Sequence, residues 1–163
     1  MKVVVVSDIH GNRTALQRII DFNPDADYIL SLGDSELPLI ELQEKNITLV
    51  KGNYPFDAGF EYDKEIKIMD TNIYMTHGHR YGVRRGIERL YDKAVEHKSD
   101  IVLYGHTHIA KVDYKDGIYF VNPGSVHRSR NGLIESYLLI YIEDDNKFRY
   151  EFKEVRTNKN IGL

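Results

Sequence analysis

Short apolar runs recur along the chain, and each run stops at a polar motif. The first, over residues 2–6, is an unbroken run of valines after one lysine, which is typical of a strand buried on both faces. Further runs of strand type cover residues 28–32, 47–50, 73–76, 101–104 and 119–121. Doubly buried strands occur in sheets whose crossovers are helices, so this pattern predicts a layered α/β fold.

Helical periodicity fills two of the gaps between these runs. Apolar residues recur at helical spacing over residues 14–22 and 83–97, and we expect both segments to form amphipathic helices. Residues 39–45 are expected to form a shorter helix after Pro38, because proline is tolerated in the first turn of a helix.

The C-terminal part changes character. Residues 137–142 and 148–155 are strand-like and flank the polar cluster 143–147, which predicts an antiparallel hairpin. Tyr137 and Tyr141 are expected to be exposed on this hairpin and leave room for a homodimer.

Length and composition indicate one globular domain over residues 1–163, with 156–163 as a frayed tail. The formal charge of -3 gives no general attraction to nucleic acid or to anionic membranes. The absence of cysteine excludes disulfides, thiolate metal ligands and a cysteine nucleophile, and favours the cytoplasm. No apolar run is long enough for a signal peptide or a membrane span, so we expect no membrane partner.

Side chains of types that commonly bind metals follow the apolar runs, at the point where each run ends. They are Asp8, His10, Asp34, Asn53, His77, His79, His106 and His108. In open α/β sheets, ligands bind beyond the carboxyl ends of the strands, so we expect these side chains to converge. Carboxylate, amide and imidazole groups gathered in this way suit two divalent cations, an arrangement used in attack on phosphate esters.

Spacing supports this interpretation, although each motif alone has a structural alternative. Residues two apart in an extended segment point the same way, so Asp8 with His10, and His106 with His108, can each address one cation. A lone His-x-His pair also occurs at surfaces and in cores without metal. Asp34 is also a suitable helix N-cap, and the residues around Asn53 also suit a turn.

The ordered set of motifs resembles the calcineurin-like metallophosphoesterase family. The motifs are Asp8-x-His10, Gly33-Asp34, Gly52-Asn53, His77-Gly78-His79 and Gly105-His106-Thr107-His108. The short chain and its Asn122-Pro123-Gly124-Ser125 segment resemble the small bacterial and archaeal phosphodiesterase branch, and also the retromer subunit of this fold. The resemblance implies the metallo-dependent phosphatase fold, a four-layer αββα sandwich of two mixed sheets flanked by helices.

The resemblance also implies a site. It assigns Asp8, His10 and His108 to a first metal and makes Asp34 the bridge. Asn53, His77 and His106 would complete a second metal site, with His79 in an outer shell where hydrogen bonds orient the ligands. Asn53, His77 and Asp34 are the implied catalytic residues, because they would stabilise charge on the phosphorus and hold the bridging nucleophile.

One position departs from the wider family. Many members have a histidine directly after the Gly-Asn asparagine, followed by an acidic residue, and that histidine is implied to protonate the leaving group. Tyr54 stands there in this chain, with Asp57 as a displaced acid. Tyrosine, with an unperturbed pKa near 10, is a poorer proton donor at neutral pH. The small branch also lacks the histidine, so its loss does not argue against activity. The loss does imply slower turnover or a preference for good leaving groups.

Basic residues crowd the same loops, at Arg13, Arg80, Arg84, Arg85, Arg128 and Arg130. Arg13 and Arg80 adjoin ligand motifs and are expected to bind substrate together with Tyr54 and His79. The alternative for each arginine is solvated surface charge. His127 is expected to point at the pocket, and His97 is given no role.

The sequence therefore predicts a dinuclear phosphodiesterase that cleaves small or nucleotide-type phosphodiesters through a metal-bridging hydroxide. Mn²⁺ is favoured, with Fe, Zn²⁺, Ni²⁺ and Co²⁺ as alternatives, since such a mixed ligand set discriminates weakly among metals. Two other hypotheses stand beside it. One is a metal-dependent phosphomonoesterase or phosphoprotein phosphatase, and the other is a non-catalytic interaction module resembling the retromer subunit.

Overall fold

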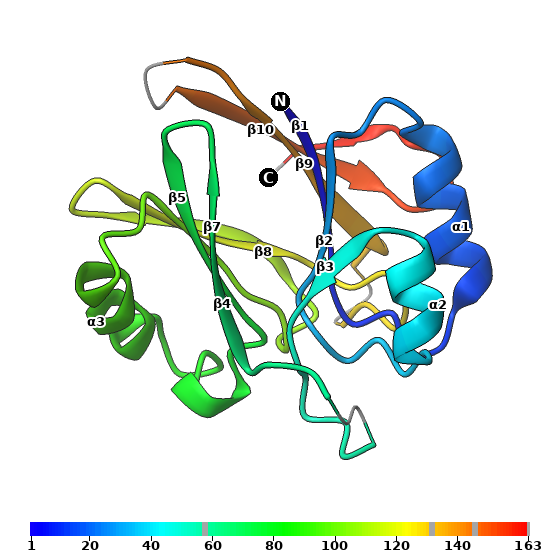
Figure 1. Cartoon of the computed structure of the whole chain (residues 1–163), viewed down its shortest axis with the longest axis horizontal. Helices are drawn as coiled ribbons and strands as arrows, with labels where there is room; N and C mark the ends of the chain where they lie inside the picture. Colours follow the sequence, from blue (N-terminus) through cyan, green and yellow to red (C-terminus); the bar gives the residue numbers. More distant parts are fainter. Residues whose placement is uncertain (57–58, 131–132, 145–146, 163) are drawn as a thin grey trace.

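Two mixed β-sheets stack face to face, and helices cover their outer faces (Figure 1). The computed structural model describes residues 1–56, 59–130, 133–144 and 147–162. Sheet A has the strand order β11-β10-β9-β1-β2-β3, and sheet B has the order β4-β5-β6-β8-β7. Helices α1 (Arg13–Phe22) and α2 (Leu39–Glu44) flank sheet A, while α3 (Glu88–Glu96) flanks sheet B. This arrangement is the four-layer sandwich that the family resemblance implies.

The strands of sheet A are β1 (Lys2–Val6), β2 (Tyr28–Ser31), β3 (Ile47–Leu49), β9 (Ser136–Ile142), β10 (Phe148–Glu154) and β11 (Asn160–Ile161). Those of sheet B are β4 (Asp63–Ile68), β5 (Thr71–Thr76), β6 (Ile101–Leu103), β7 (Ala110–Lys115) and β8 (Ile118–Pro123). The predicted strands are all present, with ends shifted by at most two residues. The predicted hairpin is β9–β10, although residues 145–146 of its turn lie outside the described residues.

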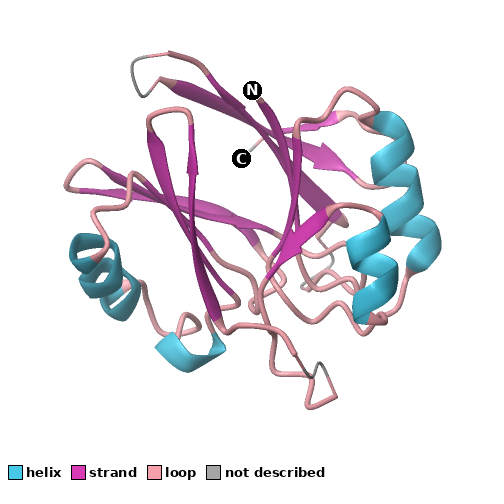
Figure 2. Cartoon of the chain, viewed as in Figure 1, coloured by secondary structure: helices cyan, strands magenta, loops and turns pink. Residues whose placement is uncertain are grey.

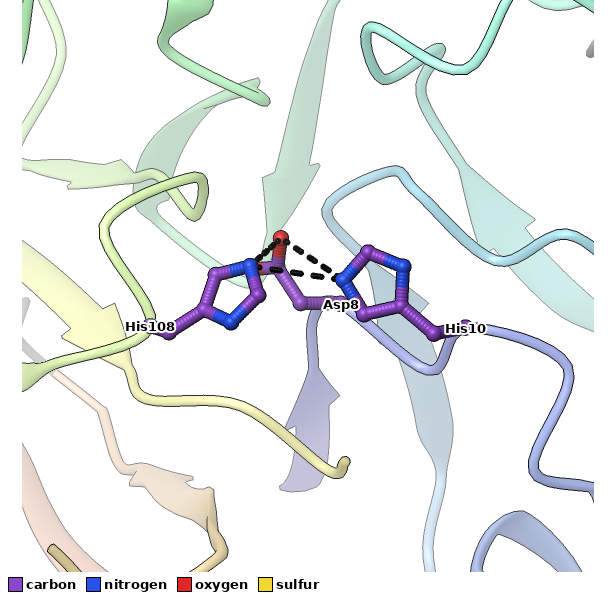
Figure 3. A group of neighbouring side chains, drawn as sticks. All are labelled: Asp8, His10 and His108. Carbon is purple, nitrogen blue, oxygen red and sulfur yellow. Dashed lines mark hydrogen bonds and ion pairs between the residues drawn. The ribbon is translucent and has the colours of Figure 1, made fainter. Parts of the chain in front are cut away.

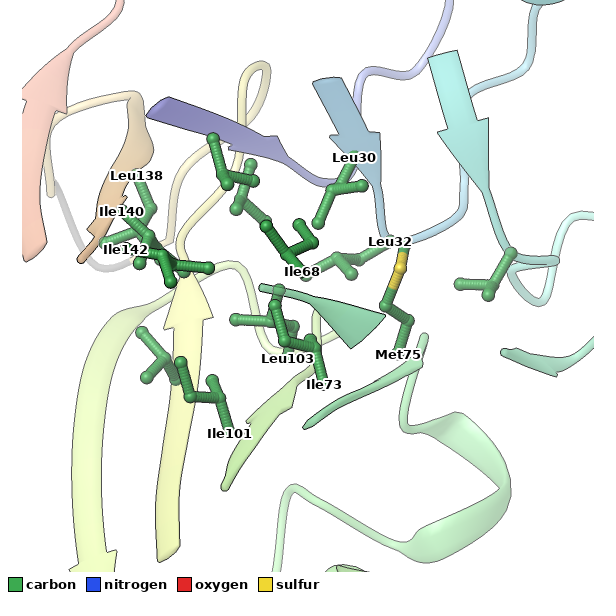
Figure 4. Close-up of a cluster of buried hydrophobic side chains, with 14 of the residues drawn as sticks. Leu30, Leu32, Ile68, Ile73, Met75, Ile101, Leu103, Leu138, Ile140 and Ile142 are labelled. Atoms are coloured by element: carbon green, nitrogen blue, oxygen red, sulfur yellow. The ribbon is translucent and has the colours of Figure 1, made fainter. Parts of the chain in front are cut away.

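The valine run of β1 is buried on both faces, as its composition predicts. Val3 and Val5 join the apolar cluster between the two sheets, which Figure 4 shows. Val4 and Val6 face the other way and pack with residues of α1 such as Leu16. This double burial makes β1 a rigid support for the loop that follows it.

The apolar pattern of the sequence does not predict three of the strands, because these strands lie at the edges of the sheets. β4 and β7 are the two outer strands of sheet B, and β11 is the outer strand of sheet A. In β4, the exposed residues Glu65 and Lys67 alternate with more buried positions, so no apolar run marks the strand. β11 corrects the expectation of a frayed tail: it pairs with β10, and Ile161 packs against the core between the sheets.

Helix α3 begins later than its periodicity predicts. Residues 83–87 form turns, and the helix starts only at Glu88. Gly82 precedes this segment and Gly86 lies within it. Their φ angles are 67° and 158°, in the region that favours glycine and interrupts a regular helix. The turns lie beside the candidate site, where they present arginines instead of helix surface.

Tyr137 and Tyr141 do not form the exposed surface expected of them. Tyr137 is fully buried and packs in the cluster under α1, where Asn23 Nδ2 donates a hydrogen bond to its hydroxyl. Tyr141 is half-buried, and the guanidinium carbon of Arg149 lies 3.6 Å from its ring centroid. These two tyrosines therefore give no support to a homodimer, which stays a prediction. Among the described helices, none is long and apolar enough to cross a membrane.

Candidate metal centre

Loops from both sheets meet at one edge of the sandwich (Figure 2). The parallel strands β1, β2 and β3 end there in sheet A, and β5 and β6 end there in sheet B. Because each candidate ligand follows the end of one of these strands, chain segments far apart in sequence come together. The residues so gathered are Asp8, His10, Asp34, Asn53, His77, His106 and His108.

One group of side chains consists of Asp8, His10 and His108 (Figure 3). Asp8 Oδ1 lies 3.1 Å from His108 Nε2 and 3.9 Å from His10 Nε2. The two imidazole Nε2 atoms lie 3.3 Å apart. An oxygen and two nitrogens thus point at one small volume, as ligands of a divalent cation do.

A second group adjoins the first through the same aspartate. Asp8, Asp34 and His77 form this group, with His77 Nε2 3.5 Å from Asp34 Oδ2 and 4.0 Å from Asp8 Oδ1. Asn53 Oδ1 lies 3.2 Å from His77 Nε2 and 2.9 Å from His106 Nδ1. Asp8 is therefore the carboxylate common to both groups. The bridging role expected for Asp34 stays a prediction.

Hydrogen bonds on the far side of three imidazoles fix which nitrogen faces the site. The Nδ1 atoms of His77 and His108 donate to the carbonyl oxygens of Leu32 and Arg128, at 2.7 Å and 2.9 Å. His10 Nδ1 lies 2.7 Å from Glu36 Oε1. With its proton held on Nδ1, a neutral imidazole turns the lone pair of Nε2 inward, so the hydrogen-bond acceptor behind the ring orients it as a metal ligand.

Asp8 provides a test of whether the site suits a cation. Its side chain is fully buried, and Oδ2 accepts hydrogen bonds from Ser7 Oγ and from the backbone N–H of His106. Oδ1 has no hydrogen-bond partner among the described residues. A buried carboxylate oxygen without a donor is costly, and a divalent cation would offset that cost. The residues present therefore fit a metal.

The pKa values reflect this packing of acids against imidazoles. Burial opposes ionisation of Asp34, but its contacts with His77 lower its pKa to about 2. Burial also opposes protonation of His77, yet Asp34 and Asp8 raise its pKa. The carboxylate of Asp8, whose Oδ1 lies 3.1 Å from His108 Nε2, raises the pKa of His108. Burial, aided by the charge on His77, lowers the pKa of His106 to about 4, so this imidazole is neutral at pH 7.

The backbone is strained at the same positions. Asp8, His10, Asp34, His106 and His108 all have positive φ angles, between 47° and 69°. Residues other than glycine rarely adopt this region, and such strain clusters at functional sites. These turns aim the side chains inward at the strand ends.

Two glycines leave the space that the site needs. A Cβ added to Gly52 would lie 2.0 Å from Asp34 Oδ1, and one added to Gly105 would lie 2.0 Å from Ser7 Oγ. These glycines precede Asn53 and His106, so the chain comes this close to its neighbours just before two candidate ligands. The Gly-Asn and Gly-His pairs of the sequence thus have a steric cause.

Two positioning residues were given no role from sequence. Glu36 faces His10, and its only sequence signal is its place two residues after Asp34. Asn122 is fully buried, and its Nδ2 donates to the Gly105 carbonyl and to Thr107 Oγ1, at 2.8 Å and 3.1 Å. Asn122 thereby holds the loop that carries His106 and His108. Its signal was the Asn-Pro-Gly-Ser segment.

The structural alternatives for Asp34 and Asn53 do not hold. Pro38 occupies the N-cap position of α2 and no side chain caps that helix, so Asp34 is not its cap. Asp34 Oδ1 instead accepts a hydrogen bond of 2.9 Å from the backbone N–H of Tyr54. The Asn53 amide oxygen faces two imidazoles and so does more than close a turn.

A cavity of about 700 Å³ opens over the candidate ligands. Of the residues expected to bind substrate, only His79 lines it. The arginines that line it are Arg84, Arg128 and Arg130. The arginines favoured from sequence, Arg13 and Arg80, do not line this cavity, because sequence adjacency to a ligand does not fix the direction of a side chain.

Arg13, Arg80 and Tyr54 do not line the cavity. Arg13 Nε lies 2.9 Å from Glu41 Oε2 on α2, and the Arg80 guanidinium carbon lies 4.4 Å from the Tyr62 ring centroid. The Tyr54 ring packs edge-on against Phe56, with centroids 5.5 Å apart. Asp57, the suggested displaced acid, lies outside the described residues.

The remaining histidines also lie outside this cavity. The Nδ1 of His127 lies 3.4 Å from Glu135 Oε1 and 3.3 Å from Asn12 Nδ2, which corrects the expectation that it points at the pocket. His97 Nδ1 lies 2.8 Å from Glu65 Oε1 at the far end of α3, and His97 has no role at the site.

Comparison with known proteins places this geometry in a family. Residues 1–145 match the model of the calcineurin-like phosphoesterase superfamily domain. The probable metallophosphoesterase YsnB of Bacillus subtilis is 32% identical over 146 residues, covering 89% of this chain and 86% of YsnB. The phosphodiesterase YfcE of Escherichia coli K12 is 26% identical over 168 residues, covering 84% of this chain and 85% of YfcE.

A solved structure shares the fold closely. The crystal structure of a predicted phosphoesterase from Streptococcus pneumoniae TIGR4 superposes with a TM-score of 0.86 at 30% sequence identity, covering 94% of this chain and 89% of that one. Sequence and structure comparisons thus agree over nearly the whole fold. The chain belongs to the calcineurin-like phosphoesterase superfamily.

Proposed function

We propose that this chain is a dinuclear metal-dependent phosphodiesterase that acts on small or nucleotide-type phosphodiesters. The observation that carries the proposal is the pair of adjoining ligand groups that share Asp8. Two groups in contact suit two cations held side by side, the arrangement of many phosphoesterases. Family membership supports phosphoesterase activity, and the relative YfcE, named a phosphodiesterase, supports the diester.

Asp8, His10 and His108 would hold one cation, Asn53, His77 and His106 the other, and Asp34 would be shared by the two. When bound, the two cations would supply a nucleophile at neutral pH and Lewis acidity toward the phosphoryl oxygens. Mn²⁺ is the favoured metal because carboxylate and amide oxygens are hard ligands, whereas a set of imidazoles alone would shift the preference toward Zn²⁺.

The chain's own residues would position the substrate. Arg84, Arg128 and Arg130 line the cavity over the ligands and can form charge-assisted hydrogen bonds with phosphate oxygens. His79 also lines the cavity and can donate a hydrogen bond to the substrate. The Asn53 amide nitrogen can donate to a phosphoryl oxygen while its oxygen faces the imidazoles.

The leaving-group side of the reaction favours labile diesters. Tyr54 follows Asn53 in the sequence, but its ring packs on Phe56 and does not line the cavity. A leaving group with a high pKa would therefore draw its proton from water, whereas a phenol-type leaving group needs no proton. We expect turnover of aryl phosphodiesters to exceed turnover of alkyl ones.

The test compares bis(p-nitrophenyl) phosphate with p-nitrophenyl phosphate, using protein stripped by chelator and then given Mn²⁺. We expect metal-dependent cleavage of the diester, lost in Asp34→Ala and retained in the control Asp21→Ala, which changes an exposed carboxylate of α1. Preference for the monoester would favour a phosphatase. No turnover with any divalent metal would favour the interaction module and overturn the proposal.

A further inference from the structure

A second cavity of about 530 Å³ adjoins the cavity over the ligands, and Arg84 and Arg130 line both. The loop after β6 also separates them. His106 and His108 line the first cavity, while Thr107 and Ile109 line the second. Alternate side chains of one short segment therefore form a common wall, so a molecule bound at the candidate ligands lies next to the second cavity.

The second cavity carries excess positive charge. Its cationic residues are Arg84, Arg85, Lys111 and Arg130, against the carboxylates of Glu88 and Asp113. Lys111 Nζ lies 2.9 Å from Asp113 Oδ2. Within the part of the chain that the structure describes, Arg84, Arg85 and Arg130 form no ion pair with a carboxylate. Guanidinium groups in this state bind phosphate through paired hydrogen bonds.

A buried hydroxyl and apolar side chains complete the lining. Tyr104 is only 2% exposed, and its hydroxyl has no hydrogen bond to any described residue. Burial, together with the charge of Asp113, raises its pKa, so the hydroxyl keeps its proton and can donate it. Val83, Ile87 and Ile109 supply apolar surface. The cavity thus combines donors for an anion with surface for a ring.

We propose that the second cavity is a subsite for a phosphate carried by one ester arm of the substrate. The substrate class is then a nucleotide phosphodiester that bears a further phosphate: the scissile phosphate lies at the candidate ligands and the further phosphate lies among Arg84, Arg85, Lys111 and Arg130. The inference rests on the proposed function for the reaction, but binding at the subsite is measurable without turnover.

The test is calorimetric titration of the Mn²⁺-loaded protein with thymidine 3′,5′-bisphosphate and with thymidine 5′-monophosphate. The two probes differ by one phosphate. Charge-assisted hydrogen bonds contribute about 1.5–3 kcal/mol each, so we expect the bisphosphate to bind at least about 10-fold more tightly. Equal affinities, or binding of neither probe, would overturn the subsite.

Variants locate the preference, and the readout is the ratio of the two dissociation constants. Arg85→Ala and Lys111→Ala alter residues that line only the second cavity, and the double variant should bring the ratio close to one. Tyr104→Phe removes one hydroxyl and should reduce the ratio several-fold. The control Arg89→Ala removes the same charge from the exposed surface of α3 and should leave the ratio unchanged.

The failures of the two proposals are distinguishable. A bisphosphate preference that persists in the double variant would refute the subsite, whatever the activity. A preference that the double variant abolishes, in a protein that cleaves no phosphodiester with any metal, would keep the subsite and refute the phosphodiesterase.

Discussion

The two sheets bring different chemistry to the same site. The loops of sheet A carry the two carboxylates, the amide and one imidazole, at Asp8, Asp34, Asn53 and His10, whereas the candidate ligands on the described loops of sheet B are all imidazoles. Each of these three oxygen ligands faces an imidazole of sheet B across the site. Between the strands themselves, the two sheets meet through apolar side chains (Figure 4).

This difference teaches how the sandwich is joined. Apolar contact between the sheets is indifferent to pH and to metal, but contact between acids and imidazoles depends on a positive charge between them. In the metal-free chain that charge is the proton, as the raised pKa values of His77 and His108 indicate. Changes in pH or in metal content should therefore alter the stability of the sandwich at its ligand end.

Removing the carboxylate of Asp8, which both ligand groups share, should have the largest effect on the site. Asp8→Asn keeps the shape of the side chain but removes the charge that both ligand groups use. We expect metal content and kcat/KM to fall by more than about 100-fold, since losses outside the ligand sphere already reach 10–100-fold. Elemental analysis of the purified variant and diester hydrolysis measure the two effects. Wild-type metal content would refute the shared role of Asp8.

The support of the ligands also differs between the sheets. His77 and His108 are oriented by backbone carbonyls, which substitution cannot remove, whereas His10 is oriented by the side chain of Glu36. Glu36→Gln should therefore weaken metal binding by about 10-fold to 100-fold. Competition with a chelator measures the affinity. Glu44→Gln, at the exposed end of α2, is the matched control and should leave the affinity unchanged.

The pH dependence of stability should separate the two ends of the sandwich. His77 and His108 have raised pKa values, so they stabilise the metal-free fold below the unfolded-state pKa of about 6.5. That contribution is lost as pH rises through their folded-state pKa values. We expect the Tm of the metal-free protein to fall as the pH rises above about 6.5.

The metal-loaded protein should show the opposite trend over the same range, because fewer protons then compete with the cations. Calorimetry on both forms at constant ionic strength tests this. Parallel curves for the two forms would mean that the imidazoles do not couple protons to metal. Asp8→Asn should flatten the curve of the metal-free form.

The smallest effect is expected at Arg13, on the outer side of sheet A. Its guanidinium pairs with Glu41 and is 57% exposed, and exposed ion pairs contribute about 0.2–1 kcal/mol. Arg13→Ala should change kcat/KM by less than about twofold and unfolding free energy by less than about 1 kcal/mol. A large loss of activity in this variant would show that Arg13 does contribute to substrate binding.

Much of the fold can be predicted from the sequence, because a buried face of a helix or strand produces a periodic pattern of apolar residues. The valines of β1 and the apolar stripe of α1 indicate their own elements without help from the rest of the chain. β4 and β7 do not, since edge strands need apolar residues on only part of one face. The start of α3 was also missed, because backbone conformation at Gly82 and Gly86 overrides the apolar spacing.

The candidate site likewise contains residues that the sequence identifies and residues that it does not. Its seven candidate ligands could be named because they end strands and carry distinctive chemistry. Glu36 could not be named, and Asn122 and Arg84 were noted without a definite role, because these roles depend on where a turn directs a side chain. The error at Arg13 has the same cause: this residue begins α1, and its side chain reaches α2 and not the cavity.

The close approaches at Gly52 and Gly105 set the mutational tolerance of the site. Neither residue offers a functional group, yet a single methyl group at either would collide with Asp34 or Ser7. A library covering every substitution should therefore be depleted at these two positions as strongly as at the ligands themselves. In this part of the molecule, selection would act on empty volume as strictly as on chemistry.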